Sequence, residues 1–252
     1  EKPKTMKVEV VGDVSEGVGP KDIILGIIRK IGTGGGAGHV IEYAGDVVKN
    51  MSMENRMTIC NMSIEGGARA GMIAPDEVTF NYLKEKNYAP KGSDWEDAIT
   101  EWGNLYSDED AVFDKVVTIN ADELEPSISW GTNPSQVIFV NDTIPHPNDF
   151  DEESEKEAAS RALEYMDLKP GEKISEIQLD RVFIGSCTNG RIEDLREAAE
   201  VVKGEKVSEK IGAMIVPGST LVKKQAEEEG LDKVFIEAGF DWREAGCSMC
   251  LG

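Results

Sequence analysis

Three cysteines are the residues whose spacing most clearly indicates chemistry in this chain. Cys187 stands alone in the sequence Ile-Gly-Ser-Cys-Thr-Asn-Gly, and sixty residues later Cys247 and Cys250 form a Cys-x-x-Cys pair. Closed zinc sites and closed iron–sulfur clusters take four protein ligands, whereas three cysteines leave one coordination position for water or substrate. The pattern therefore indicates a metal or cluster that takes part in a reaction.

Each cysteine also has a plainer interpretation. A lone cysteine in a turn is more often a small buried residue, and Cys-x-x-Cys also occurs as half of a zinc ribbon or as a redox dithiol. A zinc ribbon needs a second pair, which the sequence lacks. Another alternative is zinc held by Cys187 with His39 or His146, although neither histidine lies in a ligand pattern. Cys60, at core spacing in a helical run, is interpreted as packing.

The elements around the cysteines place them where ligands usually bind. Residues 185–190 link a predicted strand to a predicted helix, so their N–H groups and the helix N-terminus can stabilise a thiolate or an anion. Cys247 and Cys250 follow the last predicted strand. Ligands of parallel α/β sheets bind beyond the carboxyl ends of strands, so the cysteines are predicted at the correct edge.

Strands and helices alternate along the chain, which predicts an α/β fold of mainly parallel sheets covered by helices. A domain boundary is expected near residue 122, giving domains at 1–122 and 123–252. Ser52 is the expected N-cap of a helix at 53–70. The other expected helices are at 21–31, 76–86, 95–106, 152–166, 191–203 and 221–229, and strands at 6–11, 116–120, 137–140, 181–184, 214–216 and 234–237.

Two further segments could approach a ligand. Asn61 and Glu65 stand four residues apart in the helix predicted over 53–70, hence on one face, with Gly66 and Gly67 directly after them. The alternative, which the pattern alone favours, is a surface ion pair between Glu65 and Arg69. The glycine-rich run at 34–38 could cradle an anion, but it lacks the features of a P-loop or of a dinucleotide fingerprint.

Composition excludes several classes of function. Lys and Arg number 27 against 48 Asp and Glu, a net charge of -21, which repels phosphate backbones and anionic membrane surfaces. No nucleic-acid partner and no membrane partner is expected. The chain has no apolar stretch approaching the ~20 residues that cross a bilayer, and its four cysteines are too few for a disulfide scaffold. With no recognisable signal peptide, the prediction is a cytoplasmic protein.

Taken together, the motifs resemble the aconitase superfamily. The resemblance is carried by residues 182–189, 237–240 and 246–251, and within the superfamily the chain closely resembles the 3-isopropylmalate dehydratase large subunits of leucine biosynthesis. It implies aconitase-type three-layer α/β/α domains, the second and third domains of that family. Further matching stretches lie at residues 4–7, 21–23, 52–54, 56–58, 61–62, 74–77, 130–134 and 191–196.

The resemblance implies a hydro-lyase with a 4Fe-4S cluster on Cys187, Cys247 and Cys250, in which one iron has no protein ligand. That iron acts as a Lewis acid on a small 2-hydroxy dicarboxylate. Loss and return of water would interconvert 2-isopropylmalate and 3-isopropylmalate. Asn61 and Glu65 match the family's Asn-x-x-x-Glu motif near the cluster, where the glutamate handles the leaving hydroxyl or water. Asn189 is assigned a polar role beside the cluster.

The resemblance also implies a partner, a separate small subunit whose serine removes the carbon-bound proton. The sequence lacks the family's Asp-Ser-His-Thr motif and its Asn-Arg-Asn-Phe-Glu-Gly-Arg segment. The chain is therefore expected to be a fragment of a large subunit that is inactive alone. Two alternatives stay open: a large subunit that acts on homoaconitate or citramalate, and a non-catalytic iron–sulfur binding protein or structural remnant.

Overall fold

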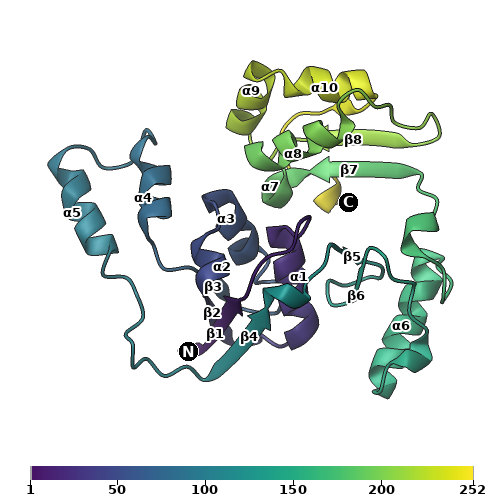
Figure 1. Ribbon diagram of the computed structural model, residues 1–252, viewed down its shortest axis with the longest axis horizontal. Coiled ribbons are helices and arrows are strands. Elements are labelled where there is room, and N and C mark those ends of the chain that lie inside the picture. The colour runs from purple at the N-terminus through teal and green to yellow at the C-terminus, as the bar shows by residue number, and fades with distance from the viewer. Residues whose placement is uncertain (1, 252) are drawn as a thin grey trace. The chain divides into compact units, whose positions relative to one another are not determined.

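A computed structural model describes the backbone of residues 2–251 and the side chains of residues 2–249. It divides into two compact units, one extending to Glu176 and the other beginning at Ile177. Figure 1 traces both units along the chain, and each is described by itself. No helix in the described part of the chain has the length and apolar character to span a membrane.

The first unit is built on a four-stranded parallel sheet with strand order β3-β2-β1-β4. In β1 the side chains of Met6, Val8 and Val10 are fully buried and alternate with Lys7 and Glu9, as a half-buried strand requires. Because β1 pairs in parallel with both β2 and β4, it lies inside the sheet. The strands are β1 (Lys4–Val11), β2 (His39–Ala44), β3 (Ala70–Met72) and β4 (Lys115–Asn120).

Helices of the first unit follow the apolar spacing in the sequence. Helix α1 begins with proline and buries four isoleucines recurring between Ile23 and Ile28. Ser52 caps α3, because its side chain accepts a hydrogen bond from the Asn55 amide at 3.2 Å. The helices are α1 (Pro20–Ile31), α2 (Asp46–Lys49), α3 (Met53–Asn61), α4 (Glu77–Lys84), α5 (Ser93–Trp102) and α6 (Glu153–Met166), with 3-10 turns η1 (Ala121–Glu123), η2 (Pro147–Asp149) and η3 (Ile174–Glu176).

The predicted helix over 53–70 is wrong in its second half. Helix α3 ends at Asn61, residues 62–67 form turns, and β3 begins at Ala70. The physical reason lies in the glycines: Gly67 has a φ of +82°, which no helical residue adopts, and glycine is a poor helix former. Asn61 and Glu65 therefore do not share a helical face.

The compact units divide between Glu176 and Ile177 and not near residue 122. The chain after residue 122 returns to the first core, where Leu124 and Val137 are buried. The Ser127 amide donates to Asp22 Oδ1 at 2.7 Å, which ties the antiparallel pair β5 (Ser127–Ser129) and β6 (Val137–Phe139) to α1. The assignment of the two halves to the second and third domains of the family stays a prediction.

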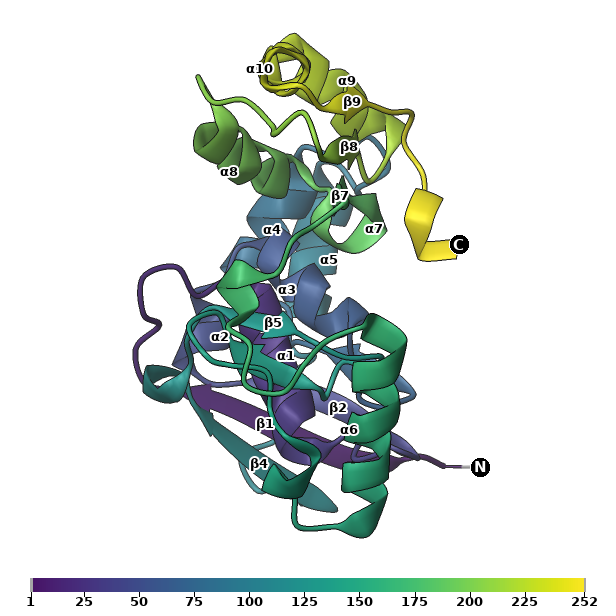
Figure 2. The same cartoon turned by 90° about the vertical axis from the view of Figure 1, so that its right-hand side faces the viewer.

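The second unit is a three-stranded parallel sheet with strand order β7-β8-β9. Its core gathers fully buried Leu195, Ile215, Ala226 and Phe235. Helices α8, α9 and α10 pack against one another (Figure 2). The elements are β7 (Arg181–Gly185), α7 (Ser186–Asn189), α8 (Ile192–Val202), β8 (Gly212–Val216), α9 (Thr220–Glu228), α10 (Leu231–Ala238), β9 (Asp241–Trp242) and the 3-10 turn η4 (Ser248–Leu251).

The strand predicted at 234–237 is wrong, because these residues lie in helix α10. Leu231, Phe235 and Ala238 recur at helical spacing and pack in the core. Left-handed Gly230 and Gly239 bound the helix on both sides. The last strand of the unit is instead β9, which still precedes Cys247. The predicted fold class, α/β with mainly parallel sheets, is confirmed.

Candidate functional site

Cys187 lies in a tightly constrained turn directly after β7. Gly185 has a φ of +127°, and a Cβ added there would lie 2.0 Å from the carbonyl oxygen of Val216. Ser186, which is buried, adopts a φ of +72°, a conformation that costs energy for a residue with a side chain. Such strain persists only where the surrounding structure fixes the backbone, and it is common at functional sites.

The same turn is locked onto the end of β8 by two more glycines. The Gly218 amide donates to the Gly190 carbonyl at 2.8 Å. A Cβ on Gly190 would lie 2.5 Å from the Ser186 carbonyl oxygen. This close backbone packing holds the turn in place, while the Cys187 thiol is free and exposed. Its sulfur lies 3.9 Å from Thr188 Oγ1. The turn thus presents a thiol on a rigid base.

Asn189 contributes a buried acceptor beside Cys187. Its Nδ2 lies 3.4 Å from Asp194 Oδ1, whereas its Oδ1 is buried and has no hydrogen-bond partner among the described residues. Asp194 also accepts from the Arg191 amide at 2.9 Å and so fixes the first turn of α8. Burial raises the pKa of the Asp194 carboxyl, and this effect outweighs the hydrogen bonds from Arg191 and Asn189, which lower the pKa. The Asn189 oxygen can accept a hydrogen bond from a ligand held at this turn.

The Cys-x-x-Cys pair follows β9 at the carboxyl end of the sheet. Because β7, β8 and β9 are parallel, Cys187 and Cys247 follow strands that end at the same edge. Cys247 is free and exposed, and Cys250 belongs to η4, although its side chain lies outside the described residues. Within the described part of the chain, no three or more His, Cys, Asp or Glu side chains form a group that could hold a metal.

The donor chemistry nevertheless fits an iron–sulfur cluster. Both described candidate cysteines are free thiols at the surface, and neither belongs to the core of the second unit. Thiolates are the ligands of iron–sulfur clusters. The histidines of the zinc alternative lie in the first unit, where His39 Nδ1 contacts the Ala37 carbonyl at 2.9 Å and His146 Nδ1 accepts from the Asn148 amide at 3.1 Å.

Asn61 and Glu65 lie in the first unit, on different types of structure. Asn61 is the last residue of α3, and Glu65 is exposed in the turn over residues 62–67. The structure places these two on one segment and the cysteines in the other unit. The predicted convergence of Asn61 and Glu65 with the cysteines therefore stays a prediction.

The glycine-rich run at 34–38 does not form the anion cradle considered from the sequence. Three of its amides already donate to carbonyls of the protein: the Gly35 amide to Gly32, the Gly36 amide to Gly66 and the Ala37 amide to Gly34, at 3.1, 2.8 and 3.0 Å. The run instead packs against the turn that carries Glu65. The sequence analysis missed this contact between the two segments. Its signal in the sequence is that both segments, at 34–38 and at 66–67, are rich in glycine.

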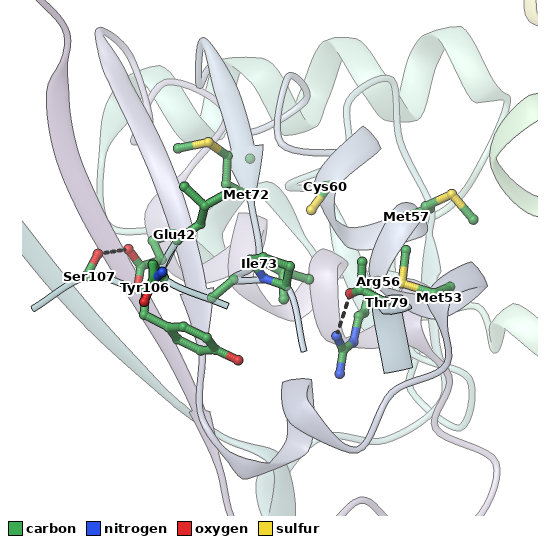
Figure 3. A pocket seen from close by; sticks show the side chains of 15 residues that line it. Glu42, Met53, Arg56, Met57, Cys60, Met72, Ile73, Thr79, Tyr106 and Ser107 are labelled. Atoms are coloured by element: carbon green, nitrogen blue, oxygen red, sulfur yellow. Dashed lines mark hydrogen bonds between the residues drawn. The ribbon is translucent and has the colours of Figure 1, made fainter. Parts of the chain in front are cut away.

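A pocket in the first unit was also missed. It has a volume of about 700 Å³, and Figure 3 shows Glu42 bonded to Ser107 at one end and Arg56 beside Thr79 at the other. Burial raises the pKa of Cys60 to about 11, so this thiol stays protonated. Its partial burial against the core agrees with the packing role expected. The apolar lining includes Met53, Met57, Cys60, Met72 and Ile73.

Comparison with known proteins identifies a family and a similar solved structure. The model of the Aconitase family (aconitate hydratase) matches residues 1–252. Among solved structures, the crystal structure of Thermococcus kodakaraensis aconitase X (holo-form) is 13% identical, with a TM-score of 0.45 over 97% of this chain. The chain spans 44% of the length of that protein.

Proposed function

The chain belongs to the aconitase family, and we propose that within this family it forms part of the large subunit of a 3-isopropylmalate dehydratase. The observation that carries the proposal is the turn after β7: a strained, glycine-locked backbone that presents the free Cys187 thiol beside the unpaired oxygen of Asn189. The motifs at 182–189 and 246–251 support the same assignment.

Cys187, Cys247 and Cys250 would hold the 4Fe-4S cluster. When bound with three cysteines, the cluster supplies a Lewis-acidic iron with an open coordination position. The locked turn holds the Cys187 backbone in one place, so the turn needs little reorganisation when the thiolate binds. The Asn189 oxygen accepts a hydrogen bond from a donor group of the bound ligand.

Glu65 is the proposed acid and base for the oxygen chemistry. In the dehydration direction its carboxyl group gives a proton to the substrate hydroxyl, which leaves as water when the C–O bond breaks. The carbon-bound proton leaves to a base of the small subunit, and its electron pair forms the double bond. In the hydration direction the Glu65 carboxylate takes a proton from the attacking water. Asn61 orients the substrate.

The first experiment is anaerobic reconstitution with iron and sulfide, followed by visible absorption and electron paramagnetic resonance. Cys187→Ser is expected to lose the cluster signal. Cys60→Ala, a change at the cysteine assigned to packing, is the matched control and should keep it. A folded chain with wild-type cluster content after Cys187→Ser would contradict the proposal.

Substrate and partner are tested by turnover of the complete reconstituted large subunit that contains this chain, with and without a small subunit. We expect activity on 2-isopropylmalate only when the small subunit is present. Glu65→Gln should lower kcat by at least about 100-fold, since acid–base catalysis is worth that much, while cluster content is unchanged. Faster turnover of homoaconitate or citramalate would favour those family members. A stable cluster without turnover in any pairing would favour a non-catalytic iron–sulfur protein.

A further inference from the structure

We propose that the buried hydroxyl pair of Tyr43 and Ser63 is a positioning device that fixes the turn carrying Glu65. The inference rests on the proposed function, in which Glu65 handles the leaving hydroxyl. Neither hydroxyl is assigned contact with substrate. Both are positioning residues that act through the backbone of the turn.

A chain of hydrogen bonds links strand, turn and helix. The Tyr43 hydroxyl lies 2.8 Å from Ser63 Oγ, and Ser63 Oγ donates to the Ile59 carbonyl at 3.3 Å. Because the Ser63 proton is used toward Ile59, the Tyr43 hydroxyl is the donor to Ser63. Tyr43 belongs to β2, Ile59 to α3 and Ser63 to the turn between α3 and β3. The pair therefore fixes the start of the turn relative to the central sheet.

The pair has no space in which to move. Tyr43 and Ser63 are each only 2% exposed. A Cβ added at Gly71 in β3 would lie 2.0 Å from Ser63 Oγ and 2.9 Å from Tyr43 Cε2. The backbone of β3 thus covers the hydroxyls directly, and only glycine fits there. Strand β3 therefore encloses the pair together with β2 and α3.

The rest of the turn is held by its own backbone and by the glycine-rich run. The Ala68 amide donates to the Ser63 carbonyl at 3.1 Å, and the Gly67 amide to the Ile64 carbonyl at 2.9 Å. Gly36 donates to the Gly66 carbonyl at 2.8 Å. The tip of the turn at Ile64 and Glu65 projects from this base, and Ile64 is 65% exposed. Glu65 therefore extends from a turn whose two ends are both fixed.

The environment of the pair keeps the Tyr43 hydroxyl protonated. Burial raises the pKa of Tyr43 to about 12, against the hydrogen bond to Ser63, and the neighbouring acidic groups of Cys60 and Glu65 add to the rise. Tyr43 is therefore a protonated donor throughout the physiological range. Two buried hydroxyls that bond to each other contribute little net stability compared with an apolar pair of similar shape, but their hydrogen bond allows only one arrangement of the two side chains. A single fixed arrangement suits a turn that must hold a proton-transfer group in position.

The test uses the cluster-loaded enzyme with its small subunit and compares Tyr43→Phe, Ser63→Ala and Gly71→Ala. Gly71→Ala displaces the Ser63 hydroxyl without removing it. Each variant should lower kcat about tenfold with KM unchanged, because small misplacements of a reacting group are costly. Amide hydrogen exchange over residues 63–68 should also become about tenfold faster. The control Ile119→Val removes one buried methyl group from β4, at the far edge of the sheet, and should change neither value.

The outcomes separate this inference from the proposed function. Wild-type kcat and wild-type exchange in Tyr43→Phe and Ser63→Ala, with activity lost in Glu65→Gln, would overturn the inference alone. Equal losses of kcat in Ile119→Val would also overturn it, since the effect would then be general destabilisation. Full activity in Glu65→Gln would overturn the proposed role of Glu65 and with it the catalytic purpose of the pair.

Discussion

The ion pair between Arg56 and Asp76 gives the sharpest prediction about stability. Only 3% of the Arg56 side chain is exposed, and its Nη1 and Nη2 donate to the two Asp76 oxygens at 2.7 Å each. Asp76 Oδ1 also caps α4 by accepting from the Val78 and Thr79 amides at 3.0 and 3.3 Å. The pair joins α3 to the start of α4 and adjoins the pocket of the first unit.

Asp76→Asn keeps the size of the side chain and its ability to cap the helix, but it leaves the Arg56 charge buried without a counterion. Removing one partner of a buried pair costs about 3–5 kcal/mol. Water reaches 25% of the Asp76 side chain and screens part of the interaction, so we expect a loss of about 2–3 kcal/mol. Further loss is limited because Arg56 Nη2 still donates to the Lys49 carbonyl at 2.7 Å.

The assay is urea unfolding combined with hydrogen exchange resolved by segment, which separates the first unit from the second. Exchange should become faster over α3 and α4 in Asp76→Asn while the segments from β7 to β9 keep their protection. The matched control is Glu229→Gln, which breaks an exposed bidentate pair with Arg196 and should leave the unfolding midpoint unchanged. An Asp76→Asn midpoint equal to wild type, at an unchanged urea dependence, would refute the reasoning.

Three further predictions concern pH, the cysteine turn and the second core. Burial opposes ionisation of Asp76, but the bonds from Arg56 and the Thr79 and Val78 amides outweigh it and lower its pKa. The stabilisation that ionised Asp76 gives the folded protein is therefore fully present above the pKa of an unfolded aspartate, about 3.9, and is lost as the pH falls through the lower pKa of folded Asp76. The difference in unfolding free energy between wild type and Asp76→Asn, measured by urea titration, should therefore shrink below about pH 4. Gly185→Ala should abolish cluster assembly measured by visible absorption, because its Cβ would lie 2.0 Å from the Val216 carbonyl oxygen at a φ of +127°; normal assembly would show that the turn can relax. Phe235→Ala, at a fully buried site, should cost about 3–5 kcal/mol and be seen as early melting of the second unit by circular dichroism.

Periodicity in the sequence predicts most of the elements in this fold. The isoleucines of α1 and the alternation in β1 are strong signals, since each places apolar side chains on one face. The type of element at 234–237 is ambiguous from the sequence, because a run as short and apolar as this one fits a buried strand as well as a helix. The flanking glycines at 230 and 239, read together with Leu231 and Ala238, favour the helix.

Long-range packing is what the sequence does not reveal. The bond from Tyr43 to Ser63 joins residues twenty positions apart, and the contact of the glycine-rich run with the Glu65 turn depends on the order of strands in the sheet. The extent of the first unit beyond residue 122 has the same cause, since Leu124 and Val137 contribute to a core formed by distant strands. Local pattern predicts elements, whereas these contacts follow from topology.

The two sets of candidate residues lie at opposite edges of their sheets. Cys187 follows the carboxyl end of β7, where ligands of parallel sheets usually bind. The Glu65 turn instead precedes β3, and the glycine-rich run beside it precedes β2, so both lie at the amino edge of the first sheet. The preference of ligands for the carboxyl edge of a parallel sheet supports a site at the cysteines independently of any motif, but it does not select Glu65. The hypothesis for Glu65 therefore depends on the Asn-x-x-x-Glu motif and on the fixed geometry of its turn, and Glu65→Gln is the variant that decides it.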